Sequence, residues 1–332
     1  MSAIDPREGT DRELHELEAQ LSGSFIRPEN PLYDEARTVW NGMIDRRPRG
    51  IIRAASVDDI APVLAAARRT GLPLAVRGGG HNVAGHGTVD DGLVLDLGGL
   101  RDVTVDEENH LVHVQPGATL ADVDRATKPY GLAVPLGVIS ATGVAGLCLG
   151  GGVGWLTRSD GLTADNLESA EVITAEGEHL HASAREHPDL FWGLRGGGGN
   201  FGVVSSFTFR ARRLPNPLLG GNLIYRPEHW YAALTAYARW TENLPSEMNS
   251  IISILRMPPE FEMGRSPSWW WALIGWAPNT KPGWPWLIGY GPMLHQTSKS
   301  SVRSSGRSGS LSWITYFQRV PEDTGRIPPF LV

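Results

Sequence analysis

The chain has 332 residues, of which 41% are hydrophobic and 20% charged, with a net charge of -6. Such a chain is long enough for two domains, because single cores stop growing at roughly 250 to 300 residues. The acidic balance offers no basic stripe for a phosphodiester backbone, so we expect no nucleic-acid partner. A single cysteine, Cys148, excludes an intramolecular disulfide and metal sites of the CxxC type.

Residues 1–21 are polar and acidic where a secretory signal would be basic and then apolar, so we expect a cytoplasmic protein. Residues 129–157 carry no charge, but they contain two prolines and eight glycines, which argues against a membrane span. We expect buried loop and turn there. Two readings stay open for this segment: a backbone laid closely around a large ligand, or a packed strand and helix pair.

Strands and helices alternate from about residue 49 to residue 213. Ser56, with Asp59 three residues on and Gly71 at the end, marks one helix clearly. The expected elements are a strand at 50–55, a helix at 56–71, strands at 73–77 and 92–97, an antiparallel pair at 103–106 and 110–117, a helix at 119–131, a strand and turn at 169–178, and a glycine loop leading into a strand within 189–214. The order is mixed, so a strict parallel repeat is not predicted.

Two common nucleotide motifs fail on this chain. Gly197, Gly199 and Gly202 match G-x-G-x-x-G, but the segment that follows alternates like a strand where the motif requires a helix. Gly146 and Gly151 have P-loop spacing without the lysine that would follow. Neither a Rossmann dinucleotide site nor phosphoryl transfer is predicted.

The segment AVRGGGHNVAGHG, residues 75–87, places three glycines directly before a histidine and just after a predicted strand. Backbone amides in such a loop can surround an anion, with Arg77 and His81 at the two ends. His81 and His86 are five residues apart with no third ligand in view, so no metal is expected.

Three long segments, in this order, resemble the covalent-FAD oxidoreductases of the berberine bridge enzyme type, in the vanillyl-alcohol oxidase superfamily. They are residues 33–97, 143–178 and 191–210. The resemblance implies an α+β fold: a two-subdomain FAD-binding domain of the PCMH type, followed by an antiparallel-sheet substrate domain that is incomplete here. We expect an N-terminal polar segment at 1–32, the FAD-binding domain at 33–213, the start of the substrate domain at 214–265 and an atypical tail at 266–332.

The resemblance also implies FAD as cofactor and a set of residues that contact it. In the family the histidine of the RGGGH motif carries the flavin on its 8α-methyl carbon, and His81 holds that position. The expected cofactor-binding set is His81, Arg77, Gly78, Gly79, Gly80, Asn82, Val83, Gly143, Val144, Gly146, Leu147, Gly150, Gly202 and Val203.

Some family members hold the flavin twice, through this histidine and a cysteine. The position that matches the cysteine is Ile139 in this chain, whereas Cys148 lies beyond the following glycines. We therefore expect Cys148 to be a small buried hydrophobic residue and the flavin to have one covalent bond.

The implied reaction is hydride transfer from a carbon that bears a hydroxyl or an amine to the flavin, with oxygen as acceptor. The substrate would be a small alcohol, sugar or natural product. A flavin dehydrogenase with another acceptor and a truncated, inactive flavin-binding remnant are the alternatives. Tyr225, Tyr231 and Glu242 are available acids or bases, but no motif selects a catalytic base among them.

The chain departs from the family after Arg265. Seven of its twelve tryptophans follow that residue, residues 296–312 are serine-rich, and the family's C-terminal tyrosine and asparagine motif is missing. Two explanations compete: a divergent aromatic substrate lid, or the translation of a shifted reading frame that ends early. We expect the second.

Overall fold

The computed structural model describes residues 6–214, 218–225, 230–255, 268–276 and 314–317. The chain separates into two compact units, residues 1–213 and residues 214–331. None of the helices in the described ranges is long and apolar enough to cross a membrane.

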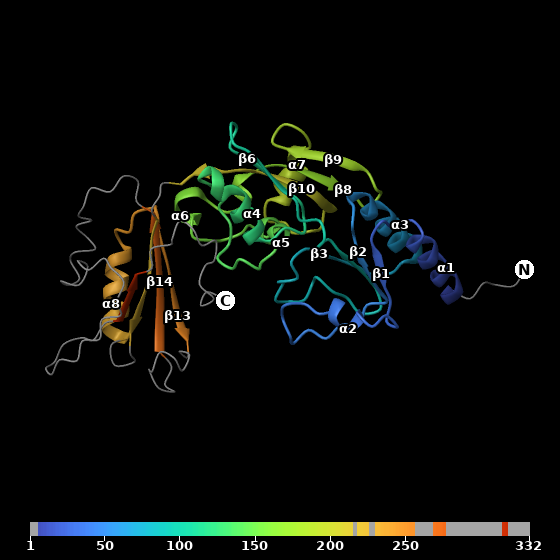
Figure 1. The fold of residues 1–332 in the computed structure, drawn as a ribbon, viewed down its shortest axis with the longest axis horizontal. Helices are drawn as coiled ribbons and strands as arrows, with labels where there is room; N and C mark the ends of the chain where they lie inside the picture. The colour runs from blue at the N-terminus through green and yellow to red at the C-terminus, as the bar shows by residue number, and fades with distance from the viewer. Residues whose placement is uncertain (1–5, 215–217, 226–229, 256–267, 277–313, 318–332) are drawn as a thin grey trace, which may run out of the picture. The chain divides into compact units, whose positions relative to one another are not determined.

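The first unit begins with a four-stranded sheet in the order β1-β2-β4-β3. Strands β1, β2 and β3 are labelled in Figure 1. Strands β2 (Gly50–Arg53) and β3 (Leu74–Arg77) both run parallel to β4 (Leu93–Asp96). Strand β1 (Ser24–Ile26) pairs with β2 in the antiparallel direction. All three parallel strands lie within the predicted ranges, because short apolar runs bounded by turn residues are a strong strand signal.

Two helices cover one face of this sheet. Helices α1 (Pro6–Glu18) and α3 (Ile60–Thr70) contact each other and place Leu14, Leu17 and Ile60 in one core cluster with Leu93. Helix α2 (Tyr33–Ala36) packs on a second cluster with Ile51 and Val94, the residues that alternate to the opposite face. Helix α1 was not expected within the polar N-terminal segment. Its few apolar residues pack against α3, which the local pattern cannot reveal.

The predicted cap of the 56–71 helix is confirmed. Ser56 and Asp59 form a capping box at the short 3-10 turn η1 (Val57–Asp59), which continues into α3. The carboxylate of Asp59 is 1% exposed and also accepts hydrogen bonds from the N–H groups of Ser22 and Ala55. Gly71 ends the helix with a φ of +69°.

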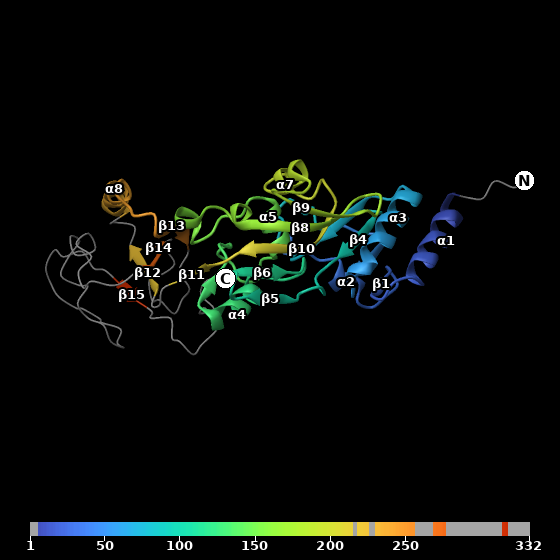
Figure 2. The same ribbon diagram turned by 90° about the horizontal axis from the view of Figure 1, so that it is seen from above.

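A five-stranded antiparallel sheet forms the second half of this unit, in the order β5-β6-β10-β8-β9. The strands are β5 (Val103–Asp106), β6 (Leu111–Val114), β8 (Leu167–Ile173), β9 (His179–Ser183) and β10 (Val203–Arg210). Phe207 and Phe209 of β10 are fully buried. Helix α4 (Leu120–Thr127), which ends in the 3-10 turn η2 (Lys128–Tyr130), lies beside β5, and α7 (Pro188–Leu194) lies beside β9 (Figure 2). The antiparallel pair β5–β6 and the strand after Gly202 are confirmed.

Residues 129–157 are less irregular than expected. They contain strand β7 (Leu132–Ala133), which pairs with β11 (Arg212–Arg213), and helix α5 (Val144–Leu149). Helix α6 (Thr157–Asp160) and the 3-10 turn η3 (Ala164–Asn166) follow. The expectation of loop and turn was wrong for these two elements, and the alternative that we left open, a packed strand and helix, describes them. Glycine-rich composition hides a helix whose apolar residues Val144, Ala145 and Cys148 are buried in the core beneath it.

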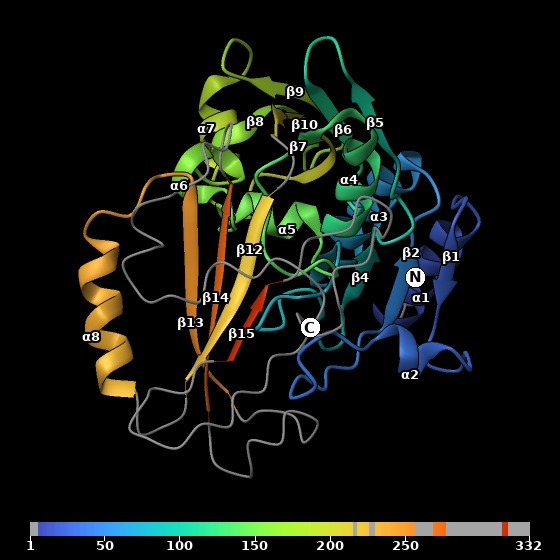
Figure 3. The same cartoon turned by 60° about the vertical axis from the view of Figure 1, so that its left-hand side comes forward.

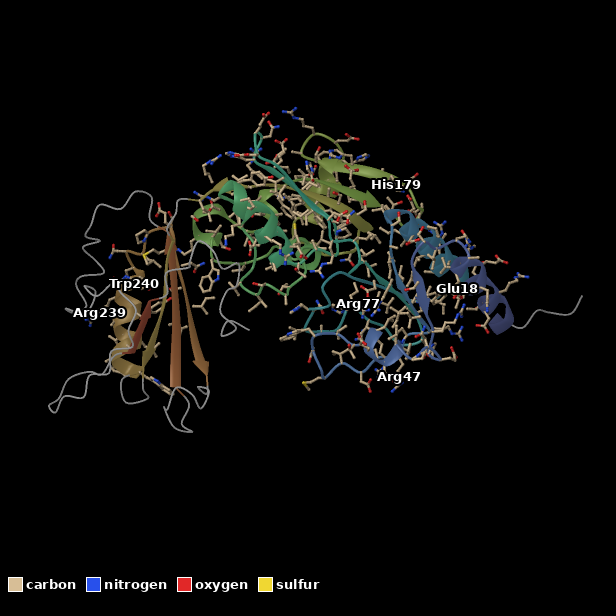
Figure 4. All side chains as sticks on the ribbon, in the orientation of Figure 1. Glu18, Arg47, Arg77, His179, Arg239 and Trp240 are labelled. Carbon is tan, nitrogen blue, oxygen red and sulfur yellow. The ribbon has the colours of Figure 1, made fainter. Side chains whose placement is uncertain are left out.

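In the second unit, the described residues form an antiparallel sheet in the order β13-β14-β12-β15 (Figure 3). Its elements are β12 (Leu218–Tyr225), α8 (Trp230–Thr241), β13 (Met248–Leu255), β14 (Ser268–Trp276) and β15 (Ile314–Phe317). Leu244 and Met248 are buried, and Trp240, labelled in Figure 4, packs against them. Two segments beyond Arg265, β14 and β15, are strands of this sheet, and the shifted reading frame stays a prediction. The serine-rich stretch 296–312 lies outside the described residues.

Candidate functional site

The candidate site is built on the loop that follows β3, residues 78–84, which we call the His81 loop. It begins at the carboxyl end of a strand in a parallel ladder, next to the end of β4. Ligand sites of open parallel sheets gather at that edge, because the loops there are free of the ladder. Leu97, directly after β4, lies next to the end of β3, because its N–H donates to the Arg77 carbonyl at 2.8 Å.

Arg77 anchors this loop from inside the protein. Its side chain is 6% exposed and donates to the Asp96 carboxylate at 2.8 Å and to the Ala36 carbonyl at 2.7 Å (Figure 4). A third bond reaches the Thr38 carbonyl at 3.3 Å. We expected this guanidinium at the end of the anion loop. Its donors are instead directed to protein acceptors, so its contribution to a ligand is the position of the loop.

Each glycine of the loop has its own structural reason. A Cβ on Gly78 would come within 2.9 Å of the Pro116 carbonyl oxygen, and a Cβ on Gly79 would overlap the backbone of Gly143. Gly80 has a φ of +69°, which favours glycine. The contact between Gly79 and Gly143 joins the first and second glycine segments, backbone against backbone.

The N–H groups of the loop are free for a ligand. No backbone N–H from Gly78 to Ala84 donates a hydrogen bond to any residue that the structure describes. The carbonyls, in contrast, are engaged: Gly80 accepts from the N–H of Trp40 at 3.1 Å and Val83 accepts from the Asn41 side chain at 2.8 Å. A run of unpaired N–H groups is an anion-binding arrangement, since each needs an acceptor from solvent or ligand.

His81 lies half-buried within the loop. Its ring stacks on the indole of Trp40, with centroids 5.5 Å apart and planes 20° apart. Burial lowers the pKa of His81 below its usual value and outweighs a hydrogen bond to the Ala141 backbone, which raises it. A neutral imidazole with an available nitrogen lone pair is a nucleophile near neutral pH.

The second glycine segment lies against this loop. Gly143 is the N-cap of α5, Val144 is fully buried, and Leu147 packs partly against the same core. Gly146 and Gly150 are exposed, and a Cβ on Gly146 would meet nothing within 4 Å. At these glycines α5 therefore has no side chain between its backbone and open space. Such a face leaves room for a large planar cofactor, and the unpaired N–H groups of the His81 loop could bind the phosphates of that cofactor.

Cys148 is on the buried side of α5. Burial raises the pKa of its thiol to about 12, and the side chain is a member of the core cluster around Val144. The prediction that it is a buried hydrophobic residue is confirmed. Ile139, the position matching the second flavin-bearing residue of bicovalent relatives, has no nucleophilic group.

The third glycine segment leads into β10. Gly202 has a φ of +138°, and a Cβ there would come within 2.6 Å of the Ile173 carbonyl oxygen, while Val203 is buried in the core. A cavity of about 510 Å³ lies beside this segment, lined by Asp165, Trp192, Arg195 and neighbouring residues. No residue of the His81 loop is among the residues that line this cavity.

The structure thus brings together the loop 78–83 and the segment 143–150, and places Gly202 and Val203 in a backbone and core role. Asn82 and Val83 are exposed at the tip, where Asn82 closes a turn by accepting from the N–H groups of Gly85 at 3.0 Å and His86 at 3.2 Å. Trp40 was missed by the sequence analysis. An aromatic residue directly before Asn41-Gly42, in an otherwise polar stretch, was the only signal.

Of the candidate bases, Tyr231 is 86% exposed on α8 and Glu242 is exposed just after it. The side chain of Tyr225 is outside the described residues. Among residues that the structure describes, there is no cluster of His, Cys, Asp and Glu that could hold a metal ion.

The chain has many relatives among known proteins. Residues 48–183 match the family described as FAD binding domain. The chain is 40% identical over 197 residues to the uncharacterized FAD-linked oxidoreductase YgaK of Bacillus subtilis, covering 58% of this chain and 44% of the relative. It is 36% identical over 207 residues to (R)-6-hydroxynicotine oxidase of Paenarthrobacter nicotinovorans, covering 62% and 45%. The chain therefore spans about half the length of these relatives.

Solved structures agree with the sequence relatives. The chain resembles 6-hydroxy-D-nicotine oxidase of Arthrobacter nicotinovorans with a TM-score of 0.74 at 28% identity, covering 89% of this chain and 62% of the other. It resembles BBE-like 1 of Physcomitrella patens at 0.73 and 25%, covering 81% and 57%. Glucooligosaccharide oxidase of Acremonium strictum, whose FAD is described as 6-S-cysteinyl and 8α-N1-histidyl, gives 0.70 and 28%, covering 80% and 55%.

The glycine segments, the mixed helix and sheet fold and these relatives all indicate an FAD-binding domain. The cofactor of the matched domain is FAD, and the residues of the His81 loop and α5 fit such a group. Residues 48–183 match the FAD binding domain family, the relatives in sequence are named FAD-linked oxidoreductases, and the similar solved structures include a BBE-like protein.

Proposed function

We propose that this chain binds FAD covalently through His81 and serves as the flavin-carrying part of an oxidase. The observation that carries the proposal is the His81 loop: seven successive residues, 78–84, whose N–H groups have no acceptor among the described residues, with a neutral, half-buried histidine in their midst.

Each part of the site has a separate task in this proposal. The loop N–H groups bind the pyrophosphate, and the exposed face of α5 at Gly146 leaves space for the cofactor. A ring nitrogen of His81 bonds to the 8α-methyl carbon, a single attachment since the buried Cys148 thiol stays protonated. FAD, when bound, accepts a hydride and returns two electrons to an acceptor. We assign none of the other cofactor-binding residues a catalytic role.

The substrate we propose is a small molecule with a carbon that bears a hydroxyl or an amine. The relatives include a hydroxynicotine oxidase and a glucooligosaccharide oxidase by name, which supports both classes. Because those names end in oxidase, we propose oxygen as the acceptor. The catalytic base comes from the part of the chain after residue 213, where no residue is selected.

Acid precipitation tests the covalent bond. The wild-type chain, expressed in full and purified, should keep yellow colour in the precipitate, whereas His81→Ala should release all of it into the supernatant. His86→Ala is a matched control, because His86 is an exposed histidine of the same segment, and it should behave as wild type. Mass spectrometry of tryptic peptides should place one FAD on the peptide that contains residue 81. Flavin fully extracted from the wild type would refute the attachment.

The acceptor is tested separately. Enzyme reduced anaerobically by dithionite should regain its oxidised spectrum when mixed with aerated buffer in a stopped-flow instrument, and hydrogen peroxide should accumulate in equal amount. Slow reoxidation over minutes, with fast reoxidation by a quinone or dye, would identify a dehydrogenase instead.

A further inference from the structure

The stretch just before the matched FAD domain holds the His81 loop by its carbonyl side. We call residues 36–47 the brace. The Trp40 N–H donates to the Gly80 carbonyl at 3.1 Å, and the Asn41 side chain donates to the Val83 carbonyl at 2.8 Å. Both bonds join residues about forty positions apart. The two bonds occupy carbonyl acceptors of the loop, whereas the N–H groups of the loop donate to no residue that the structure describes.

The brace is fastened at both ends. At its start, the carbonyls of Ala36 and Thr38 accept from the Arg77 guanidinium, which is itself paired with Asp96. At its end, the Arg46 guanidinium donates to the Gly85 carbonyl at 3.2 Å and the Thr88 carbonyl at 2.8 Å. The brace has no helix or strand after Ala36, so these bonds give it its shape.

Trp40 occupies an unusual position in the brace. Its side chain is 64% exposed, although burial would stabilise an indole, and its main ring contact is with the His81 imidazole. Aromatic stacking at an exposed site contributes little to the free energy of folding. The stack instead restricts the orientation of the His81 ring, because turning that ring out of its nearly parallel plane would break its contact with the indole.

We propose that Trp40 is a positioning residue for flavin attachment, which holds the His81 ring in the orientation from which its nitrogen reaches the 8α carbon of FAD. This inference rests on the proposed function of His81. Trp40 touches the residue that reacts, and the brace connects it rigidly to the loop through Gly80.

Attachment balances as an oxidation. One C–N bond forms between the unprotonated imidazole nitrogen and the 8α carbon, one hydrogen is lost from that carbon, and one proton is lost from the other ring nitrogen. The two electrons and two protons pass to dioxygen, which becomes hydrogen peroxide. The step needs an unprotonated nitrogen aligned with the carbon, and misplacement by about 1 Å can slow such reactions roughly 100-fold. Trp40 supplies alignment and takes no part in the transfer.

The test compares Trp40→Ala and Trp40→Phe with wild type and Met43→Ala in the full chain, produced flavin-free in riboflavin-starved cells. Met43 belongs to the brace and its side chain is 91% exposed, so it is a matched control. After FAD is added in air, acid-stable flavin is followed with time, and reversible FAD affinity is measured by fluorescence quenching before attachment begins. His81 is observed in the same flavin-free proteins by ¹⁵N-histidine NMR.

We expect Trp40→Ala to bind FAD within about threefold of wild-type affinity but to form acid-stable flavin roughly 10- to 100-fold more slowly. Trp40→Phe should recover most of the rate, and Met43→Ala all of it. Attachment by Trp40→Ala at the wild-type rate would overturn the proposal. So would a loss of FAD affinity as large as the loss of rate, because it would mean that Trp40 only supports binding.

Two further outcomes remain decisive. If Trp40→Ala does not melt cooperatively, Trp40→Phe and Trp40→Leu carry the test: Phe must attach flavin faster than Leu for the proposal to stand. If wild type itself gains no acid-stable flavin, the proposed attachment fails on its own. The NMR then decides about Trp40, since His81 resonances of Trp40→Ala identical to those of wild type would show that the stack does not hold the ring.

Discussion

The chain contains two glycine-rich loops of similar composition and different use. The first, residues 78–81, ends in a histidine and has no N–H donor paired among the described residues. In the second, residues 196–199, the N–H groups of Gly197 and Gly198 donate to the carbonyls of Gly193 and Leu149, both at 2.9 Å. Glycine content alone therefore does not mark an anion site. What differs between the two loops is whether their N–H groups donate to other residues that the structure describes.

The anchors of the two loops differ in the same way. Each loop starts next to an Arg–Asp pair, but the Arg77–Asp96 pair is 6% and 14% exposed, whereas the Arg195–Asp165 pair is 34% and 49% exposed. A buried pair fixes a loop firmly because neither charge can return to water alone. The His81 loop is the one that starts beside the buried pair.

The largest expected effect follows from this contrast. Arg77→Met removes the closest cation of Asp96, which keeps only the longer 3.8 Å contact with Arg53 and the Gly98 N–H, and it leaves the Ala36 and Thr38 carbonyls without their donor. The free energy of unfolding should fall by about 3–5 kcal/mol. Arg195→Met should lower it by at most about 1 kcal/mol. Urea denaturation followed by circular dichroism measures both. Equal losses for the two variants would remove the distinction between a rigid and a loosely held loop.

Glycine substitutions give the next effect. Gly79→Ala drives a Cβ into the backbone of Gly143, and overpacking of this kind costs about 1–3 kcal/mol. The shift should also separate the His81 loop from α5 and reduce acid-stable flavin. Gly199→Ala, in the second loop, meets nothing within 4 Å and should change stability by less than about 0.5 kcal/mol. Thermal melts and flavin content of the paired variants test the prediction. A silent Gly79→Ala would contradict the close contact of the two segments.

The third prediction concerns the buried thiol of Cys148. With its thiol pKa raised to about 12, iodoacetamide at pH 8 should leave the native protein unlabelled and should label it fully in urea. Cys148→Ser should cost about 1–3 kcal/mol, because a hydroxyl replaces a thiol in an apolar core, yet keep its covalent flavin. Rapid labelling of the native chain would show that the thiol is accessible, and loss of acid-stable flavin in the serine variant would show a second attachment.

The smallest effect concerns the pH dependence of His81. Its pKa is lowered in the folded chain, so the unfolded chain binds more protons and the contribution of His81 to stability is lost as pH falls below its usual value of roughly 6.5. The attachment rate should fall over the same range, since the ring nitrogen must be unprotonated. Rates of acid-stable flavin formation from pH 5 to 8 measure it. A rate that rises as the pH falls would contradict a neutral His81 as the nucleophile.

The sequence by itself determined the local elements and the cofactor. Alternating apolar residues predicted the strands at 50–53, 74–77 and 93–96, and the Ser56–Asp59 capping box predicted the start of a helix, because these signals act within a few residues. The order of three long motifs indicated FAD and singled out His81. Helix α1 was missed because it lies in polar sequence, and helix α5, which lies among glycines, was only one of two open readings; both helices depend on packing.

Only the tertiary structure decided how the candidate site is held. Arg77 and Asp96 are partners because β3 and β4 are in parallel register, and Gly79 meets Gly143 because two loops far apart in sequence pack together. Trp40 reaches His81 through the brace, across forty residues of chain. Such contacts join distant segments, and their free energy comes from the whole folded core, so no local pattern of residues specifies them.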